Sequence, residues 1–169
     1  KGLVGAILGI EDYVTEDRVG LALLAPVRVV AQQLSMLGKD SGSSTFNRPT
    51  SIELVVSPAY RIYYAGETHI DRLADHLKNG KSVYPTYLGS AFALTKPIFV
   101  GEVNSVDPIE TDGEIETATV VPTRFIESIV PEPGKNYSRA GGLMHRYLGN
   151  RIFERSVDYL YEGSGRPIR

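Results

Sequence analysis

Two long runs of β-prone residues lie between two helical patterns, and this order constrains the fold more than any other feature of the sequence. The first run, residues 19–33, is rich in Val, Leu and Ala. In the second run, residues 51–66, Ile52, Leu54 and Val56 recur at every second position. A period of two residues is typical of a strand with one buried face. The two runs therefore predict two long strands.

Each run contains one proline, Pro26 or Pro58. Because proline has no backbone N–H to donate, it predicts a bulge, a bend or an edge position in each strand. The residues between the runs, 38–48, read GKDSGSSTFNR and are typical of a polar loop. The sequence thus predicts paired strands joined by a long loop.

The first helical pattern is GLVGAILGIED, residues 2–12. Gly2, Gly5 and Gly9 are spaced three and four apart and would share one helical face. Such a bare face allows close approach of another backbone, which is either a neighbouring element of the chain or a phosphate chain. Tight packing against a sheet is the favoured interpretation.

The second helical pattern is THIDRLADHLKNG, residues 68–80. Thr68 is the predicted N-cap, and Gly80 is the predicted stop. Ile70, Leu73 and Leu77 form the predicted buried stripe.

The segment YPTYLGSAFAL, residues 84–94, predicts a corner at Pro85 and Gly89, with Leu88 buried. A strand is expected next, over residues 96–103, and another over residues 117–130. The last residues, 146–169, predict a strand pair with EGSG as its turn.

Helix, strand, strand, helix, strand is a βαββαβ unit without its first strand. We therefore predict an α+β, ferredoxin-like fold of the kind found in RNA-recognition modules. Residues 1–103 would form the core, and residues 104–169 a β-rich C-terminal extension of the same domain. Because the chain opens on Lys1, we expect that the native N-terminus and the first strand lie upstream.

Composition limits the function classes. The chain has 169 residues, of which 42% are hydrophobic and 22% charged, which is ordinary for one globular domain. It has no Cys, so disulfides and thiolate chemistry are excluded. No apolar run approaches the ~20 residues of a membrane span. We expect a cytoplasmic protein that does not contact a membrane.

Charge is distributed unevenly. Residues 1–123 carry 10 basic and 15 acidic side chains, whereas residues 124–169 carry 8 basic and 5 acidic ones. No acid occurs between Gly134 and Phe153, which makes residues 135–151 an acid-free window. Such asymmetry indicates either a polyanion partner or an unevenly charged solvated surface.

No phosphate-binding P-loop, dinucleotide fingerprint or nucleophile elbow occurs, and we expect no cofactor and no metal. Basic residues do alternate with tyrosines, around Tyr60 to Tyr64 and again in the acid-free window. Arg and Lys neutralise phosphates, while Tyr stacks on unpaired bases. Core packing is the favoured role for Tyr60 and Tyr64, and RNA contact for the acid-free window.

Several segments, in this order, resemble the fifth CRISPR-associated (Cas) protein family. KGLVGAILG resembles the end of that family's G-L-L-G-A-I-L-G helix start, and SIELVVSPAYRIYYAG resembles its second long strand. YPTYLGSAFAL resembles its Y-P-x-Y-L-G-x-S-E-F corner, with Ala91 where the family has an acid, and GSGRPIR resembles a common C-terminal ending.

The resemblance implies a repeat-associated (RAMP) subunit of a type I surveillance complex (Cascade) in antiviral defence, similar to subtype I-B. Such a subunit holds the 5′ handle of the CRISPR RNA without cleaving it. Its other partners would be the large subunit, the first backbone subunit and, indirectly, target DNA. A thumb-like insertion that covers a flipped guide nucleotide would lie within residues 32–50.

The residues expected to bind RNA come from the N-terminal helix, the thumb-like insertion and the basic C-terminal part. They are Lys1, Gly2, Gly5, Arg48, Lys135, Arg139, His145, Arg146, Arg151 and Arg166.

Two alternatives remain open at this point. One branch of the same family cleaves precursor RNA without metal, through a Tyr/Lys/His arrangement. The nearest match here is Tyr137, Lys135 and His145, although the adjacent Lys-His pair of that branch is absent. The second alternative is a protein-only interaction module.

Overall fold

The computed structural model describes residues 2–39, 42, 45–103 and 113–169. These residues form a mixed α+β arrangement, which confirms the predicted class. The elements are α1 (Gly2–Leu8), β1 (Arg18–Leu23), β2 (Val29–Lys39), β3 (Thr45–Val55), β4 (Tyr60–Ala65), α2 (Ile70–Lys78), β5 (Val121–Pro122), the 3₁₀ helix η1 (Thr123–Phe125), β6 (Tyr137–Gly149) and β7 (Ile152–Glu162).

The two β-prone runs form one long antiparallel ribbon with a break in the middle. β1 pairs with β4, and β2 pairs with β3. The break lies at Pro26 on one side and Pro58 on the other, so neither run is a single strand as predicted. Hydrogen bonds of 2.8 Å, from Leu24 N to Ala59 O and from Val56 N to Arg28 O, flank it.

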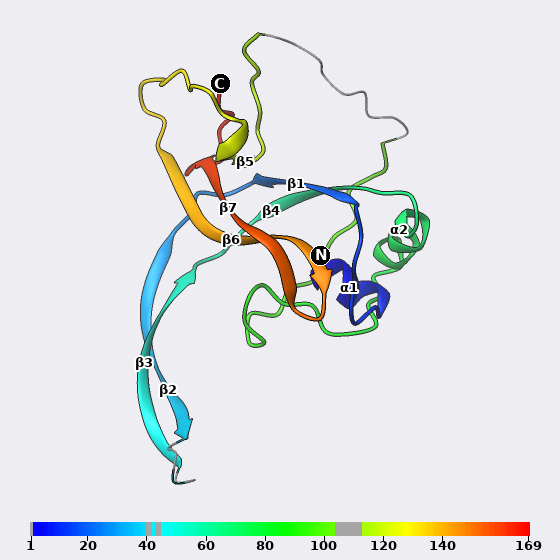
Figure 1. Cartoon of the computed structure of the whole chain (residues 1–169), viewed down its shortest axis with the longest axis vertical. Helices are drawn as coiled ribbons and strands as arrows, with labels where there is room; N and C mark the ends of the chain where they lie inside the picture. Colours follow the sequence, from blue (N-terminus) through cyan, green and yellow to red (C-terminus); the bar gives the residue numbers. More distant parts are fainter. Residues whose placement is uncertain (1, 40–41, 43–44, 104–112) are drawn as a thin grey trace.

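The outer half of the ribbon, Val29–Val55, projects from the body, and we call it the arm (Figure 1). Its pairing runs without interruption from Val29 opposite Val55 to Lys39 opposite Thr45. The predicted loop at 38–48 is therefore too long, since residues 38–39 and 45–48 belong to strands. Residues 45–49 are all exposed, so the sequence needs no alternation of apolar and polar residues there, and the strand could not be recognised from such a pattern.

Both predicted helices are present, with different ends. α1 stops at Leu8, and Gly9 follows with φ +72°, a left-handed conformation that suits glycine at a helix end. α2 starts at Ile70, after His69, and no side chain caps it, so the predicted Thr68 cap is wrong. Gly80, with φ +60°, ends the second helix as predicted.

The core lies between the helices and β4. Val4, Ile7, Leu8, Tyr13 and Leu73 form its buried cluster. Of the predicted stripe on α2, only Leu73 is buried, because the other two positions lie at the margin of the contact with α1. Figure 1 shows α1 and α2 together at one end of the β1–β4 pair.

The segment after α2 differs from its prediction. Thr86 is the buried residue of the corner, whereas Leu88 is 38% exposed, so the predicted burial of Leu88 is wrong. Gly89 has φ +78° and open space around it. Residues 96–103 form no strand, because no neighbouring strand offers them hydrogen bonds in the described chain.

The C-terminal part forms a sheet in the order β5–β7–β6. The hairpin turn between β6 and β7 is Asn150-Arg151, not EGSG. EGSG instead reverses the chain after β7, so that Ile168 pairs with Thr117 through two hydrogen bonds of 2.8 Å. Only the short elements β5 and η1 form within residues 117–130.

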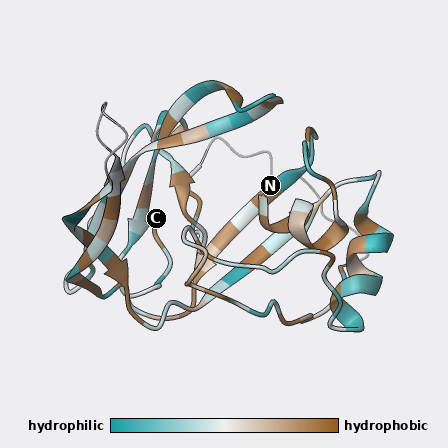
Figure 2. Cartoon of the chain, turned by 90° about the horizontal axis from the view of Figure 1, so that it is seen from below, coloured by the Kyte–Doolittle hydropathy of each residue, from teal (hydrophilic) through white to brown (hydrophobic). Residues whose placement is uncertain are grey.

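Much of the apolar surface is uncovered. Eight hydrophobic residues of the described chain are buried, while large apolar side chains such as Leu37 and Ile98 are 81% and 83% exposed. Figure 2 shows apolar residues spread along strands and connecting segments. Exposed apolar surface on this scale is typical of proteins that assemble with partners.

Candidate nucleic-acid interface

The β6–β7 hairpin and the segments that flank it carry six of the ten residues predicted to bind RNA: Lys135, Arg139, His145, Arg146, Arg151 and Arg166. Its pairing sets Tyr137 opposite Glu162 at one end and Gly149 opposite Ile152 at the other. Irregularities interrupt the pairing between Ala140 and Leu143 and again before Gly149. Within the hairpin, Arg139, His145 and Arg146 are spread along β6, and Arg151 follows at the turn.

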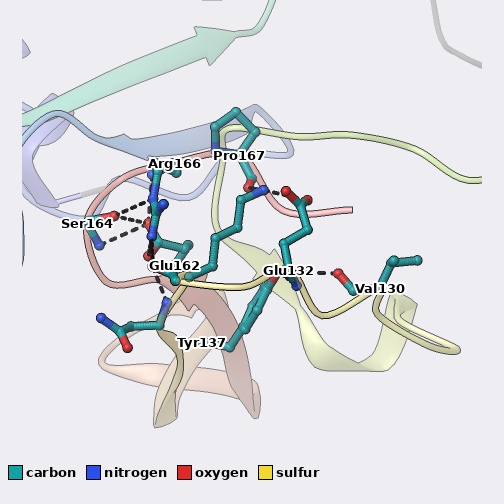
Figure 3. Close-up of polar contacts among 10 residues, drawn as sticks. Val130, Glu132, Tyr137, Glu162, Ser164, Arg166 and Pro167 are labelled. Carbon is teal, nitrogen blue, oxygen red and sulfur yellow. Dashed lines mark hydrogen bonds and ion pairs between the residues drawn. The ribbon is translucent and has the colours of Figure 1, made fainter.

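Lys135 is held inside the C-terminal turn. Its Nζ donates to Glu132 Oε1 at 2.6 Å and to the Pro167 carbonyl at 2.7 Å. The side chain is only 10% exposed. Tyr137, close by, donates from its hydroxyl to the Val130 carbonyl at 3.3 Å (Figure 3). Both side chains thus serve the fold of this turn.

Glu162 organises the same turn. It is 3% exposed, and its carboxylate accepts hydrogen bonds from the backbone N–H groups of Asn136, Ser164 and Arg166 and from the Ser164 hydroxyl (Figure 3). Burial alone would raise the pKa of Glu162, but these hydrogen bonds outweigh it and lower the pKa to about 2. Glu162 is therefore a buried carboxylate that stays charged.

Arg166 completes this network. Its guanidinium donates to the Gly134 carbonyl and the Ser164 hydroxyl, and it lies 3.4 Å from the Glu162 carboxylate. Its contacts give it a structural role in the GSG turn.

Arg139 and Arg146 also pair with carboxylates. Arg139 pairs with Asp158 across the hairpin and holds the pKa of that carboxyl below its usual range. Arg146 lies 3.1 Å from Glu154 and 3.2 Å from Glu16, and its hydrogen bond lowers the pKa of Glu154.

The acid-free window is consequently free of acids only along the sequence. In the structure, carboxylates from β7, from residue 132 and from the segment before β1 neutralise three of its cations. His145 also has interaction partners. Arg151 is the one cation of the window with no ion pair among the described residues.

Arg151 sits at the tip of the hairpin. Asn150 and Arg151 form the turn, with φ values of 50° and 62°. Two-residue hairpin turns with positive φ at both positions favour Gly at the second one. The sequence instead places an exposed Arg there, so the turn presents a cation at the cost of some backbone strain.

The three residues of the alternative catalytic site do not come together. Tyr137 and His145 are eight residues apart on one strand, and a strand rises ~3.3 Å per residue, so roughly 25 Å separates them. Lys135 lies beyond the Tyr137 end. The extended strand thus keeps Tyr137 and His145 apart and does not support a shared catalytic centre from these three residues.

The N-terminal glycines have different surroundings. A Cβ on Gly5 would stand 2.8 Å from the Ile10 carbonyl oxygen, so this glycine permits tight packing against the segment that follows α1, and not against a sheet as the favoured interpretation held. Gly2 faces open space, which keeps it accessible. Lys1 lies outside the described residues.

Arg48 lies on the arm, opposite Met36 and exposed, with no ion pair among the described residues. Arg151, at the turn of the β6–β7 hairpin, is likewise exposed and makes no ion pair among the described residues. The structure thus leaves two of the predicted arginines available for phosphate.

Sequence reasoning missed one polar cluster beneath β4. The hydroxyls of Tyr13 and Tyr64 lie 2.5 Å apart, and both donate to Asp17. Burial and the bond to Asp17 raise the pKa of Tyr64, while the hydrogen bonds to Asp17 outweigh burial and lower the pKa of Asp17. The packing of Tyr64 on the core confirms its predicted core role. No local motif signals the cluster, since Tyr64 comes from a distant strand.

Comparison with known proteins gives no match to a family model, a curated protein or a solved structure. Within the described residues, no helix has the length and apolar character needed to cross a membrane. In the same residues, no three His, Asp or Glu side chains gather into a metal-binding group.

Proposed function

We propose that this chain is a non-catalytic RNA-binding subunit of a type I CRISPR surveillance complex, holding the 5′ handle of the guide RNA. The resemblance described above suggests the family, and the arm is the observation that carries the proposal. A projecting two-stranded ribbon occupies the positions 32–50 where a thumb-like insertion is expected.

The arm has the properties of a segment that works in contact with something else. Most of its described side chains are exposed, and Met36, Leu37 and Phe46 are 51%, 81% and 49% exposed. An isolated two-stranded ribbon is marginally stable in water. Contact with a partner surface would bury the exposed apolar side chains of the arm and stabilise it. Arg48 adds an exposed cation that makes no ion pair among the described residues.

The proposal includes a ferredoxin-like core. α1 and α2 pack against each other beside the antiparallel β1–β4 pair, as the two helices of that fold do. The residues of the alternative catalytic site do not support cleavage, because the Lys135 ammonium is already engaged by the Glu132 carboxylate and the Pro167 carbonyl.

The test is a titration of fluorescently labelled 5′-handle RNA into the purified chain, alone and assembled with sibling subunits, at several salt concentrations. Arg48→Ala and Arg151→Ala should each weaken binding, and each lost phosphate contact should reduce the log–log salt slope by ~0.7. Arg18→Ala, which removes an exposed cation from β1, is the matched control and should leave affinity and slope unchanged. Unchanged affinity and slope in both variants would contradict the proposal.

A second measurement addresses catalysis. The unaltered chain, incubated with precursor RNA in the presence of a chelator, should leave the RNA intact. Site-specific cuts at the handle would assign the chain to the nuclease branch instead.

A further inference from the structure

A cavity of about 280 Å³ lies where the end of α2 meets α1 and the corner that follows it. Its apolar walls come from three separate segments, and they include Ile7, Leu77, Pro85, Leu94 and Pro97. The volume lies just below the usual range of small-molecule sites, which is ~300–1,000 Å³. It suits one or two side chains of a partner rather than a cofactor.

The rim of the cavity is held in place by backbone and side-chain hydrogen bonds. Thr95 N donates to the Thr86 carbonyl at 2.9 Å, and the Thr86 hydroxyl donates back to the Thr95 carbonyl at 2.5 Å. On the α1 side, Val83 N donates to the Ile7 carbonyl at 3.2 Å. The chain after α2 therefore passes beside α1 in a fixed path, which the green trace in Figure 1 follows. The site is preformed, which reduces the entropy lost on binding.

Two lysines that make no ion pair among the described residues line this cavity. Lys81 and Lys96 both line it, both are exposed, and neither makes an ion pair among the described residues. Lys96 Nζ lies 4.0 Å from the position that a Cβ on Gly80 would take, next to Lys81. The nearby Glu102 pairs with Lys78 instead, at 2.5 Å. Among the described residues no acid lines the cavity, so a partner with carboxylates would complement its charge.

An unpaired stretch of backbone leads away from the cavity. Among the described residues, no backbone hydrogen bond engages residues 97–101. Ile98 and Val100 are 83% and 76% exposed, whereas Phe99 between them is half-buried and lies under the Lys78 ammonium at 5.2 Å. Leu94, at the cavity mouth, is 70% exposed. Such a backbone edge with alternating apolar side chains is what strand addition requires.

We propose that the cavity and residues 97–101 form a docking site for an extended acidic segment of a partner protein. An aliphatic or aromatic side chain of that segment fills the cavity, and flanking carboxylates pair with Lys81 and Lys96. Its backbone hydrogen-bonds to residues 97–101 as an added strand. The surface is mostly apolar with only two free cations, and this balance favours a protein segment over RNA, which needs more cations and stacking surfaces.

The inference is independent of RNA binding by the arm or by the hairpin tip, since it uses none of their residues. A failure of handle binding would leave it standing, and its own failure would leave the RNA proposal standing.

The test uses the full chain and two fluorescein-labelled peptides, Glu-Val-Phe-Val-Glu-Val and Lys-Val-Phe-Val-Lys-Val, in an anisotropy titration. We expect the acidic peptide to bind and the basic peptide to bind at least about tenfold more weakly, a difference of about 1.4 kcal/mol. The Lys81→Glu/Lys96→Glu double variant should reverse this preference. Reversal by charge exchange excludes mere unfolding, and a far-UV circular dichroism spectrum checks the fold of each variant.

Leu94→Asp should weaken the acidic peptide at least about tenfold, because it places a charge at the apolar mouth. Leu37→Asp, which changes an equally exposed leucine on the arm, is the matched control and should leave binding unchanged. An acidic peptide with N-methylated backbone amides should also bind more weakly if strand pairing occurs. Absence of binding by the acidic peptide, or equal binding of both peptides, would overturn the proposal. Displacement of the peptide by an eight-nucleotide uridine RNA would also overturn it, and would make the cavity an RNA site.

Discussion

The two long hairpins of this molecule, β6–β7 and the arm, differ in how their side chains are used. The β6–β7 hairpin is connected to the rest of the chain by Tyr147, whose hydroxyl donates to Asp12, and by Arg146, which pairs with Glu16. Within its described residues the arm has one side-chain hydrogen bond, from the Thr50 hydroxyl to the Arg48 carbonyl at 3.2 Å. One hairpin is part of the body, and the other projects from it.

This difference decides which cations can meet an RNA. The C-terminal hairpin looks more basic in sequence, yet most of its cations already contact carboxylates. Surface ion pairs contribute only ~0–1 kcal/mol each, so such an Arg could exchange its carboxylate for a phosphate, but it gains less than a free one. Arg48 and Arg151 make no ion pair among the described residues, so a contact with phosphate would break no such pair. A sequence window without acids is therefore not the same as a surface without acids.

The largest expected effect concerns the anchored region. Glu162→Ala removes a buried acceptor and leaves several backbone N–H groups without a partner. We expect the free energy of unfolding to fall by about 2–4 kcal/mol, because each unsatisfied buried donor costs about 1–3 kcal/mol and some will reach water. Urea denaturation followed by circular dichroism measures this. Glu127→Ala, at an exposed carboxylate, is the control and should change stability by less than about 0.5 kcal/mol. Equal effects of the two substitutions would contradict the role given to Glu162.

The pH dependence of stability tests the same carboxylate without creating a cavity. The pKa of Glu162 is about 2 in the folded chain, below the ordinary value of 4.5. The unfolded chain therefore binds the proton first as pH falls, and the stabilisation present above pH 4.5 is lost between 4.5 and 2. Stability should decline in this window by at most about 1.4 kcal/mol per pH unit for this one group. Glu162→Gln should remove that part of the slope, and a parallel curve for the variant would contradict the assignment.

The smallest effects should separate the two hairpins. Val157 on β7 is 7% exposed, and Leu37 on the arm is 81% exposed. We expect Val157→Ala to cost about 1–2 kcal/mol of unfolding free energy, because it removes buried methyl groups, and Leu37→Ala to change it by less than about 0.5 kcal/mol. Thermal unfolding of both variants measures the difference. A cost of Leu37→Ala similar to that of Val157→Ala would show that the arm packs against the body in solution.

Several expectations from the sequence are confirmed, and each depends on local signals. The α+β class, both helices and the Gly80 stop follow from periodicity and from glycine's freedom at positive φ. The prolines correctly marked an irregularity in each run, although each run is split into two strands and is not the single strand that was predicted. These features need only residues that are neighbours along the chain.

Two of the failures share a different cause. The strand expected at 96–103 needs a partner strand, and the hairpin turn at Asn150-Arg151 gives no glycine signal. Leu88 is apolar but has no neighbouring element to cover it. The turn is local, whereas the other two outcomes depend on segments that are remote in sequence.

The sequence by itself determined where the chain can be helical, where it must turn and which residues carry charge. Those properties depend on backbone sterics, hydrogen-bonding capacity and side-chain chemistry over a few residues. Only the tertiary structure decided which charges are neutralised and which apolar residues stay exposed. It placed Glu16 against Arg146 across 130 positions of sequence, and among the described residues it left Lys81 and Lys96 without an ion pair. Electrostatic and apolar contacts act between groups that lie within a few ångströms of each other in space. The separation of two residues along the chain does not determine that spatial distance.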